Sequence, residues 1–267
     1  MIKLIAIDLD GTLLTSDKKI SQKNLEAIKY AQEKGVKVVI ATGRPLNGIK
    51  DIINKLTLLQ QDDYTICFNG GIITNNKTEA NIFQSSLSYE DLLIIYNEAK
   101  RLNTNIHAFK TDQSLITPKM SYGTEIEKNI NNLDCEIIDF TSIDKTSRFI
   151  KVMLVGYEDE INRVVSLLNP DLYNKYMINR SSKIFLEFMD LTTNKGLALD
   201  RLAKHLNIKD DEIMAIGDAE NDLAMIKKAS IGVAMQNAIP KVIEAADFIT
   251  LDNDNDGVAH AIYHFIK

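Results

Sequence analysis

Short runs of consecutive apolar residues, each followed by a helical pattern, dominate the start of the chain. Residues 4–7 and 36–41 are continuous apolar runs, which are typical of strands buried on both faces of a sheet. Between them a helix is expected that begins after Ser21 and stops at Gly35. Strands and helices alternating at this spacing predict an α/β fold, a Rossmann-like parallel sheet with helices on both faces and right-handed crossovers.

The last third of the chain repeats this pattern, starting with a helix expected near Asn194. Its strands should join the same parallel sheet, because the strand–helix spacing is the same. The expected strands cover residues 213–216, 231–234 and 247–250, and the expected helices cover residues 221–228, 238–245 and 258–266.

The middle of the chain has a different pattern, with alternating strands and hairpin-like stretches. Residues 105–109 and 114–117 are one such pair, and Ser88 with Asp91 three positions later forms a capping box before a helix. These features predict an α+β unit inserted into the α/β fold. The expected division is a discontinuous core of residues 1–84 and 188–267, with an inserted unit of residues 85–187.

Composition narrows the class of protein. The 267 residues are 45% hydrophobic and 25% charged, which is ordinary for globular chains and excludes disordered, collagen-like and coiled-coil classes. The net charge of -6 argues against a nucleic acid partner, since phosphate backbones are bound through clustered Lys and Arg. A site for an anionic substrate must therefore carry its own positive charge.

Cysteine use and hydropathy bear on the compartment. Cys67 and Cys135 are far apart and outside any Cys-x-x-Cys motif, which fits a reducing compartment. The apolar run after Met1 is cut by Asp8, unlike a signal peptide. With no apolar stretch approaching the roughly 18 residues of a membrane span, a cytoplasmic protein without a membrane partner is expected.

Two acidic residues follow the first predicted strand. Asp8 and Asp10 are two positions apart, so both project to one side at the carboxyl end of the strand, where open α/β sheets bind ligands. Gly11 lets the chain turn sharply and lets its backbone approach a ligand closely. Ionised acids beside a buried strand are costly unless a cation or a shared proton compensates them. The alternative is an acidic loop with solvated ends.

A second acidic cluster follows another apolar run. Asp218 lies at the end of that predicted strand, and Asn221 and Asp222 open the next helix. Alone, this pattern is equally typical of a helix N-terminus rich in Asp and Asn. Two such clusters on strands of one parallel sheet would converge on the same edge, however. Oxygen ligands without histidine favour Mg²⁺ over Zn²⁺ there.

Further positions could bind an anion at that edge. Thr42 and Gly43 follow the second strand and precede an expected helix bearing apolar residues at 49–56, so a hydroxyl and backbone N–H groups would face the edge. Lys195 is expected at the start of another helix. The helix dipole disfavours a positive charge at that end, so a lysine there suggests a binding role. Lys195 and Arg44 are each ambiguous alone, since a solvated side chain is the ordinary interpretation.

Taken together, these motifs resemble the haloacid dehalogenase superfamily of phosphatases, across essentially the whole chain. The four motifs of that superfamily occur in its chain order: Asp8-Leu-Asp-Gly-Thr12, Thr42, Lys195 and Gly217-Asp-Ala-Glu-Asn-Asp222. Similarity to the Cof-type branch is seen at Ala41-Thr-Gly-Arg-Pro45, Asn69-Gly70 and residues 213–222. Residues 60–64, 149–153 and 233–240 are similar to the sugar phosphatases within that branch. That branch carries a large α+β cap inserted between the second and third motifs, which matches residues 85–187.

The resemblance implies a Mg²⁺-dependent phosphomonoesterase for small phosphorylated metabolites, sugar phosphates first, acting through an aspartyl-phosphate intermediate. Asp8 is the implied nucleophile and Asp10 the implied general acid and base. The implied magnesium ligands are Asp8, the Asp10 backbone carbonyl and Asp218. The implied phosphate- or substrate-binding residues are Thr42, Gly43, Arg44, Lys195 and Asn221, with Asp222 in support.

Two other functions stay open at this point. A sugar phosphomutase could use the same residues, and a non-catalytic sugar-phosphate sensor could keep the pocket, although a sensor has no need for both Asp8 and Asp10. Residues 252–257 match only half of a calcium loop, because Tyr263 stands where glutamate is required. His107 is expected to be a structural histidine, while the substrate's identity and the oligomeric state are not readable.

Overall fold

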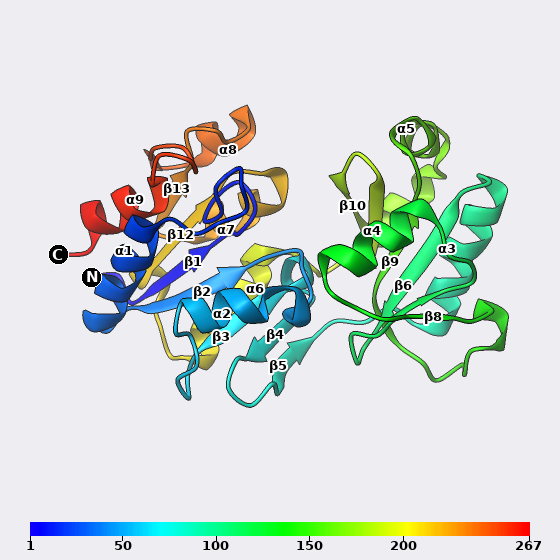
Figure 1. Cartoon of the computed structure of the whole chain (residues 1–267), viewed down its shortest axis with the longest axis horizontal. Helices are drawn as coiled ribbons and strands as arrows, with labels where there is room; N and C mark the ends of the chain where they lie inside the picture. Colours follow the sequence, from blue (N-terminus) through cyan, green and yellow to red (C-terminus); the bar gives the residue numbers. More distant parts are fainter. The chain divides into compact units, whose positions relative to one another are not determined.

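The computed structural model describes every residue from 1 to 267, and the chain divides into two compact units (Figure 1). One unit contains Met1–Gly43, Lys50–Phe83 and Asn194–Lys267, and the other contains Arg44–Ile49 and Gln84–Thr193. Compared with the division expected from the sequence, residues 44–49, 84 and 188–193 group with the second unit.

The first unit is built on an eight-stranded sheet with the order β14-β13-β12-β1-β2-β3-β4-β5. The strands from β14 to β3 run parallel, as expected, and the hairpin partner β4 pairs antiparallel to β3. The strands are β1 (Leu4–Ile7), β2 (Lys37–Ala41), β3 (Tyr64–Cys67), β4 (Ile72–Asn75), β5 (Asn81–Gln84), β12 (Ile213–Gly217), β13 (Ile231–Ala234) and β14 (Phe248–Ile249).

Helices cover both faces of this sheet (Figure 1). They are α1 (Gln22–Glu33), α2 (Lys50–Lys55), α6 (Lys195–His205), α7 (Leu223–Lys228), α8 (Pro240–Ala245) and α9 (Gly257–Phe265). Right-handed crossovers place α1 and α2 on one face and α7 and α8 on the other. In agreement with this, α1 packs beside α9, and α6 packs beside α7.

Local sequence signals set the ends of these helices. The Ser21 side chain accepts the backbone N–H of Asn24 and caps α1, and Gly35 follows the helix with a φ of 80°. The Asn194 side chain accepts the N–H of Leu197 and caps α6 in the same way. Because Asn194 is the cap, Lys195 becomes the first residue of α6.

The chain after β2 turns before it enters the next helix, as the sequence predicts. A 3₁₀ turn covers Leu46–Ile49, and α2 begins at Lys50. Pro45 favours this turn, since the residue before a proline is disfavoured in the helical region. Thr42 and Gly43 therefore lie in the segment that leads from β2 to the helical residues.

The second unit contains a six-stranded sheet with the order β10-β11-β9-β6-β7-β8. Its pairs are antiparallel except for β7 with β8, and the expected hairpin is β6 with β7. The elements are α3 (Tyr89–Arg101), β6 (Asn105–Lys110), β7 (Leu115–Thr117), α4 (Tyr122–Ile130), β8 (Cys135–Ile137), β9 (Phe149–Val155), α5 (Glu158–Leu167), β10 (Tyr176–Ser182) and β11 (Phe185–Asp190).

The two faces of this second sheet differ in chemistry. One face packs an apolar core against α3, which has the predicted Ser88–Asp91 capping box, and against α5. On the other face lie His107 and Lys151, and α4 packs there through Gly123 against Val155. His107 and Lys151 are buried on this face beside the rings of Phe109 and Phe185.

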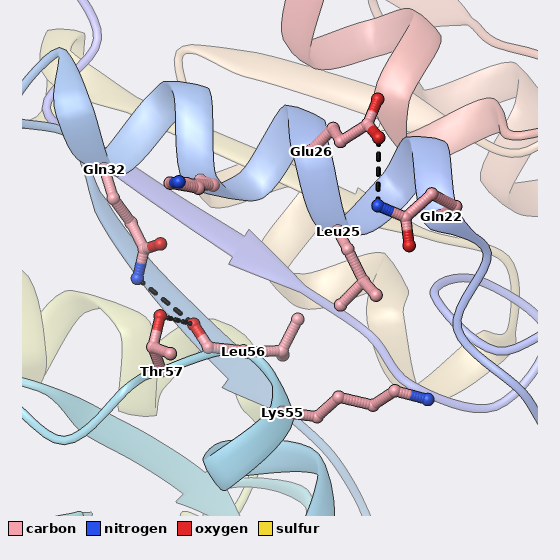
Figure 2. Close-up of a pocket in the computed structure, with 8 residues that line it drawn as sticks. Gln22, Leu25, Glu26, Gln32, Lys55, Leu56 and Thr57 are labelled. Atoms are coloured by element: carbon pink, nitrogen blue, oxygen red, sulfur yellow. Dashed lines mark hydrogen bonds between the residues drawn. The ribbon is translucent and has the colours of Figure 1, made fainter.

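A shallow surface pocket of about 170 Å³ lies where α1 meets the end of α2 (Figure 2). Its polar groups contact one another, with Gln22 bonded to Glu26 and Gln32 to the Leu56 carbonyl. None of the residues predicted to carry chemistry lines it. The helices of the chain are all too short or too polar to span a bilayer.

Candidate functional site

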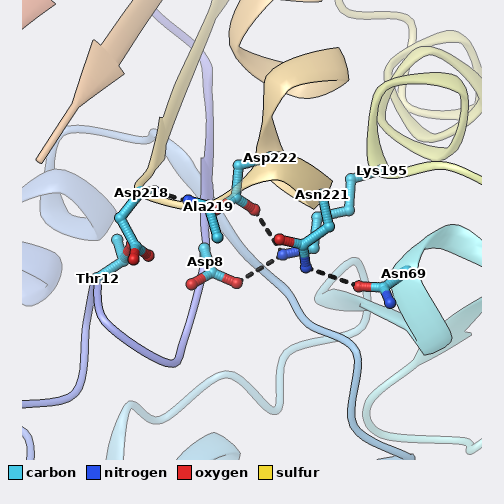
Figure 3. Close-up of polar contacts among 8 residues, drawn as sticks. All are labelled: Asp8, Thr12, Asn69, Lys195, Asp218, Ala219, Asn221 and Asp222. Atoms are coloured by element: carbon cyan, nitrogen blue, oxygen red, sulfur yellow. Dashed lines mark hydrogen bonds and ion pairs between the residues drawn. The ribbon is translucent and has the colours of Figure 1, made fainter. Parts of the chain in front are cut away.

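Three carboxylates meet at the carboxyl edge of the parallel sheet. Asp8 directly follows β1 and Asp218 directly follows β12, and these strands pair in parallel with Ile7 opposite Ile216. Asp8, Asp218 and Asp222 each bring one carboxylate oxygen within 4.8 Å of the other two (Figure 3). The structure thus brings together the two acidic clusters that the sequence placed at one edge.

The loop after Asp8 holds Asp218 in place. The Thr12 hydroxyl donates to Oδ1 of Asp218 at 2.8 Å, and Asn237 Nδ2 donates to the Gly11 carbonyl at 2.9 Å. Gly11 has a φ of 88°, and a Cβ there would lie 2.5 Å from Oδ2 of Asp218. Only glycine allows this approach.

Lys195 is a fully buried cation between two acids. Its Nζ donates to Oδ1 of Asp8 and to Oδ1 of Asp222, both at 2.6 Å (Figure 3). The other oxygen of Asp222 accepts the backbone N–H groups of Asp218 and Ala219 at 3.0 Å each. Both Asp222 oxygens are therefore engaged within the protein, which suits a supporting residue better than a metal ligand.

Charge at this edge is unbalanced within the protein, with three acids facing one lysine. Burial and the neighbouring Asp222 raise the pKa of Asp8, although Lys195 opposes them. Burial also raises the pKa of Asp218 to about 6. Burial alone would lower the pKa of Lys195, but the carboxylates of Asp222 and Asp8 outweigh it and raise the pKa. Burial is the larger cause of both raised carboxyl pKa values, and a cation beside these carboxylates would lower them.

The donor set fits a hard divalent cation. Lys195 takes one oxygen of Asp8 and Thr12 takes one oxygen of Asp218, so the second oxygen of each is left for a cation. Carboxylate oxygens without nitrogen or sulfur ligands are what Mg²⁺ prefers. A cation would also supply the positive charge that the cluster lacks.

A buried asparagine joins the other predicted residues to this edge. Asn221 Nδ2 donates to Oδ1 of Asn69 at 2.9 Å (Figure 3), and the Asn69 backbone N–H donates to the Thr42 carbonyl at 2.9 Å. A Cβ on Gly43 would lie 3.2 Å from Oδ1 of Asn69. Asn69 therefore bonds to Thr42 through its backbone and to Asn221 through its side chain, and this side chain lies close to Gly43.

Asn69 and Thr12 were not among the predicted site residues. Asn69 has a left-handed φ of 54° and follows β3, and Gly70 after it has a φ of 100°. An Asn-Gly pair directly after a buried strand is a turn signal at the same sheet edge, and it could have identified Asn69. For Thr12, the signal was its place in the first motif.

Two other predicted residues make contacts of a different kind. The Asp10 side chain is 39% exposed and accepts from Lys18 Nζ at 2.9 Å. Arg44 groups with the second unit, where burial raises the pKa of Glu127 and the charges of Lys151, and then of Arg44, oppose that shift.

The remaining acidic motif, residues 252–257, has structural contacts. Asp254 accepts the backbone N–H and the hydroxyl of Ser16 at 2.8 and 2.6 Å, and Asp256 pairs with Lys23 at 3.1 Å. Asn253 Nδ2 donates to the Leu14 carbonyl at 2.9 Å. This loop therefore fixes the segment that follows Asp10 and Gly11.

Residues 5–262 match the family of haloacid dehalogenase-like hydrolases. YxeH of Bacillus subtilis is 37% identical over 100% of this chain and 99% of its own. A 5-amino-6-(5-phospho-D-ribitylamino)uracil phosphatase of the same organism, YcsE, is 35% identical over 99% and 96%. The solved structure of a subclass IIB sugar phosphatase, BT4131, has a TM-score of 0.78 at 27% identity, covering 98% of both chains.

The chain belongs to the haloacid dehalogenase-like hydrolase family. The resemblance noted in the sequence, the fold class and the expectation of an enzyme of the phosphatase class are thereby confirmed.

Proposed function

We propose that this protein is a Mg²⁺-dependent phosphomonoesterase acting on small phosphorylated metabolites, with sugar phosphates as the favoured class. The observation that carries the proposal is the buried contact of Lys195 with both Asp8 and Asp222, beside a further carboxylate, Asp218, that still has an oxygen for a cation. The names of YcsE and BT4131, a ribityl-phosphate compound phosphatase and a sugar phosphatase, support this substrate class.

In the proposed reaction, a carboxylate oxygen of Asp8 attacks phosphorus in line while the bond from phosphorus to the leaving oxygen breaks. Asp10 gives its proton to that oxygen, and then takes a proton from the water that attacks the aspartyl-phosphate. Hydrolysis releases inorganic phosphate and regenerates the Asp8 carboxylate. Asp10 begins and ends the cycle protonated.

The remaining residues would position the Asp8 carboxylate and the phosphate and compensate their negative charges. Asp8, the Asp10 carbonyl and Asp218 would hold Mg²⁺, which when bound reduces the repulsion between the Asp8 carboxylate and the phosphate dianion. Lys195 orients the Asp8 carboxylate, and Asp222 fixes Lys195. Thr42, Gly43 and Asn221 would bind phosphoryl oxygens, with Asn69 holding Asn221 in place. A cytoplasmic location and the role of the second unit as a cap stay predictions.

Asp8→Asn tests the proposal, with Asp17→Asn as control because Asp17 is exposed on the neighbouring turn. With p-nitrophenyl phosphate and Mg²⁺, Asp8→Asn should lose about 10³-fold or more of kcat. Asp17→Asn should match the wild type, and EDTA should abolish turnover by both. Release of free phosphate separates hydrolysis from a mutase reaction. Full activity of Asp8→Asn would refute the proposal.

A further inference from the structure

The carboxyl group of Asp10 is paired with a lysine of the loop that follows it. Lys18 Nζ donates to Oδ1 of Asp10 at 2.9 Å, and the side chains of the lysine and the acid are 62% and 39% exposed. An ion pair as exposed as this one is screened by water and adds little to stability. The contact is therefore better explained by orientation, on which a group that transfers protons depends.

A closed turn keeps Lys18 within reach of Asp10. The Thr15 N–H donates to the Lys19 carbonyl, and the Lys18 N–H donates to the Thr15 carbonyl, both at 2.8 Å. The Thr15 hydroxyl accepts the Lys19 N–H at 3.2 Å. Lys18 has a left-handed φ of 59°, which is unfavourable for a residue with a side chain and persists only where the surroundings hold it. The turn thus fixes the backbone from which the Lys18 side chain extends.

The loop is tied at two points to a distant part of the chain. Asn237 Nδ2 donates to the Gly11 carbonyl at 2.9 Å. Asp254 accepts the backbone N–H of Ser16 at 2.8 Å and the Ser16 hydroxyl at 2.6 Å. These contacts anchor the loop one residue after the acid and two residues before the lysine.

The two anchoring residues are connected to each other. Asn237 Oδ1 accepts the backbone N–H of Asn253 at 3.2 Å, and Asn253 precedes Asp254 in the chain. Asn253 is buried, and its Nδ2 donates to the Leu14 carbonyl at 2.9 Å. All of these residues belong to the first unit. The acid and the lysine are therefore held relative to one another by a single set of contacts.

We propose that Lys18 is a positioning residue that holds the carboxyl group of Asp10 in the orientation needed for proton transfer. The inference rests on the proposed function, in which Asp10 gives a proton to the leaving oxygen. Lys18 donates a hydrogen bond to Oδ1 and keeps its own proton, so the proton that moves is that of Asp10. The loss of Lys18 should therefore matter most where the leaving group needs a proton.

The test compares two substrates whose leaving groups differ in this need. Phenolate, like an ionised tyrosine side chain, is a strong base and a poor leaving group, whereas p-nitrophenolate leaves without a proton donor. Lys18→Met should lower kcat/KM for phenyl phosphate about tenfold more than kcat/KM for p-nitrophenyl phosphate, both measured with Mg²⁺. Lys18→Arg keeps a cationic donor and should recover most of the wild-type preference between the two substrates.

Lys19→Met is the matched control, because Lys19 is an exposed lysine of the same turn and its loss changes the charge equally. This control should keep the wild-type preference. Equal losses with both substrates in Lys18→Met would indicate a binding or purely structural role and would overturn the inference, as would no loss with either. The proposed function fails separately, if the wild type with Mg²⁺ hydrolyses neither substrate.

Discussion

Gly11 shows how one residue can limit the geometry of the acidic edge. Its φ of 88°, and the 2.5 Å that would separate an added Cβ from Oδ2 of Asp218, leave no room for a side chain. Gly11→Ala should lower the free energy of unfolding by about 3 kcal/mol and reduce kcat about tenfold or more, because Asp218 must move. Chemical denaturation and turnover of p-nitrophenyl phosphate measure the two effects.

Gly35 is the matched control for Gly11. Its φ is 80°, but a Cβ there would meet nothing within 4 Å. Gly35→Ala should cost about 1 kcal/mol of stability through the backbone conformation alone and leave kcat unchanged. Equal losses of activity in the two variants would contradict the account of Gly11.

At this scale the sequence identified the residues that follow or open an element. Asp8 and Asp218 could be placed at one edge because parallel strands end there together, whereas Lys195 was ambiguous alone and was assigned to the site by the family resemblance. The Asn69-Gly70 turn signal could place Asn69 at that edge, but it could not predict the hydrogen bond between Asn69 and Asn221. That bond depends on tertiary packing, which a single sequence does not specify.

At the scale of elements, α4 rests on the second sheet through polar contacts that include a neutral histidine. His107 is fully buried, its Nδ1 lies 3.2 Å from the Thr124 hydroxyl, and its pKa is lowered to about 3. In the unfolded chain this histidine gains a proton below about pH 6.5. Stability from the neutral ring is therefore present above that pH and is lost as the pH falls towards 3.

Urea unfolding at about pH 7 and about pH 5 measures this effect. His107 should account for about 2 kcal/mol of the stability lost between these pH values. The His107→Gln variant has no titrating ring at this position. Between the same two pH values its free energy of unfolding should therefore fall by about 2 kcal/mol less than that of the wild type, whatever its stability at neutral pH. Parallel pH dependences for the two proteins would show that His107 is not the cause.

Regular elements could be predicted where capping residues and apolar periodicity agree. Ser21, Ser88 and Asn194 each cap a helix as expected. The helix that bears the apolar residues at 49–56 was predicted from their spacing, and the structure divides it into a 3₁₀ turn at Leu46–Ile49 and α2 from Lys50. The spacing did not predict that residues 44–49 group with the second unit.

At the scale of the whole molecule, Mg²⁺ should stabilise the fold in a pH-dependent manner. Asp8 and Asp218 have raised pKa values, so without metal their contribution to stability is present below the unfolded pKa of about 3.9 and is lost as the pH rises through the folded values. Mg²⁺ binds the ionised carboxylates and offsets that loss. Mg²⁺ should therefore raise the Tm of the protein more at about pH 8 than at about pH 6.

Thermal unfolding with Mg²⁺ and with EDTA at both pH values measures the difference. Asp218→Asn, which keeps the shape of the side chain but not its charge, should lose most of the increase. An equal increase of Tm in Asp218→Asn would place the ion elsewhere.

The insertion of one unit into the other could be predicted, because the strand–helix rhythm stops and resumes along the sequence. Its boundaries could not be placed to the residue, since residues 44–49 and 188–193 join the second unit through contacts rather than through sequence pattern. The sequence also carries no pattern for the pairing of Lys151 with Glu187, which depends on the register of β9 with β11.

The most direct measurement of the central claim is to trap the phosphorylated enzyme. Asp10→Asn lacks the group that activates water, while p-nitrophenol leaves without a proton donor, so the aspartyl-phosphate should accumulate. After incubation with p-nitrophenyl phosphate and Mg²⁺ and an acid quench, peptide mass spectrometry should find one phosphoryl group on Asp8. A phosphoryl group on another residue, or none at Asp8 while the wild type turns over, would contradict the account.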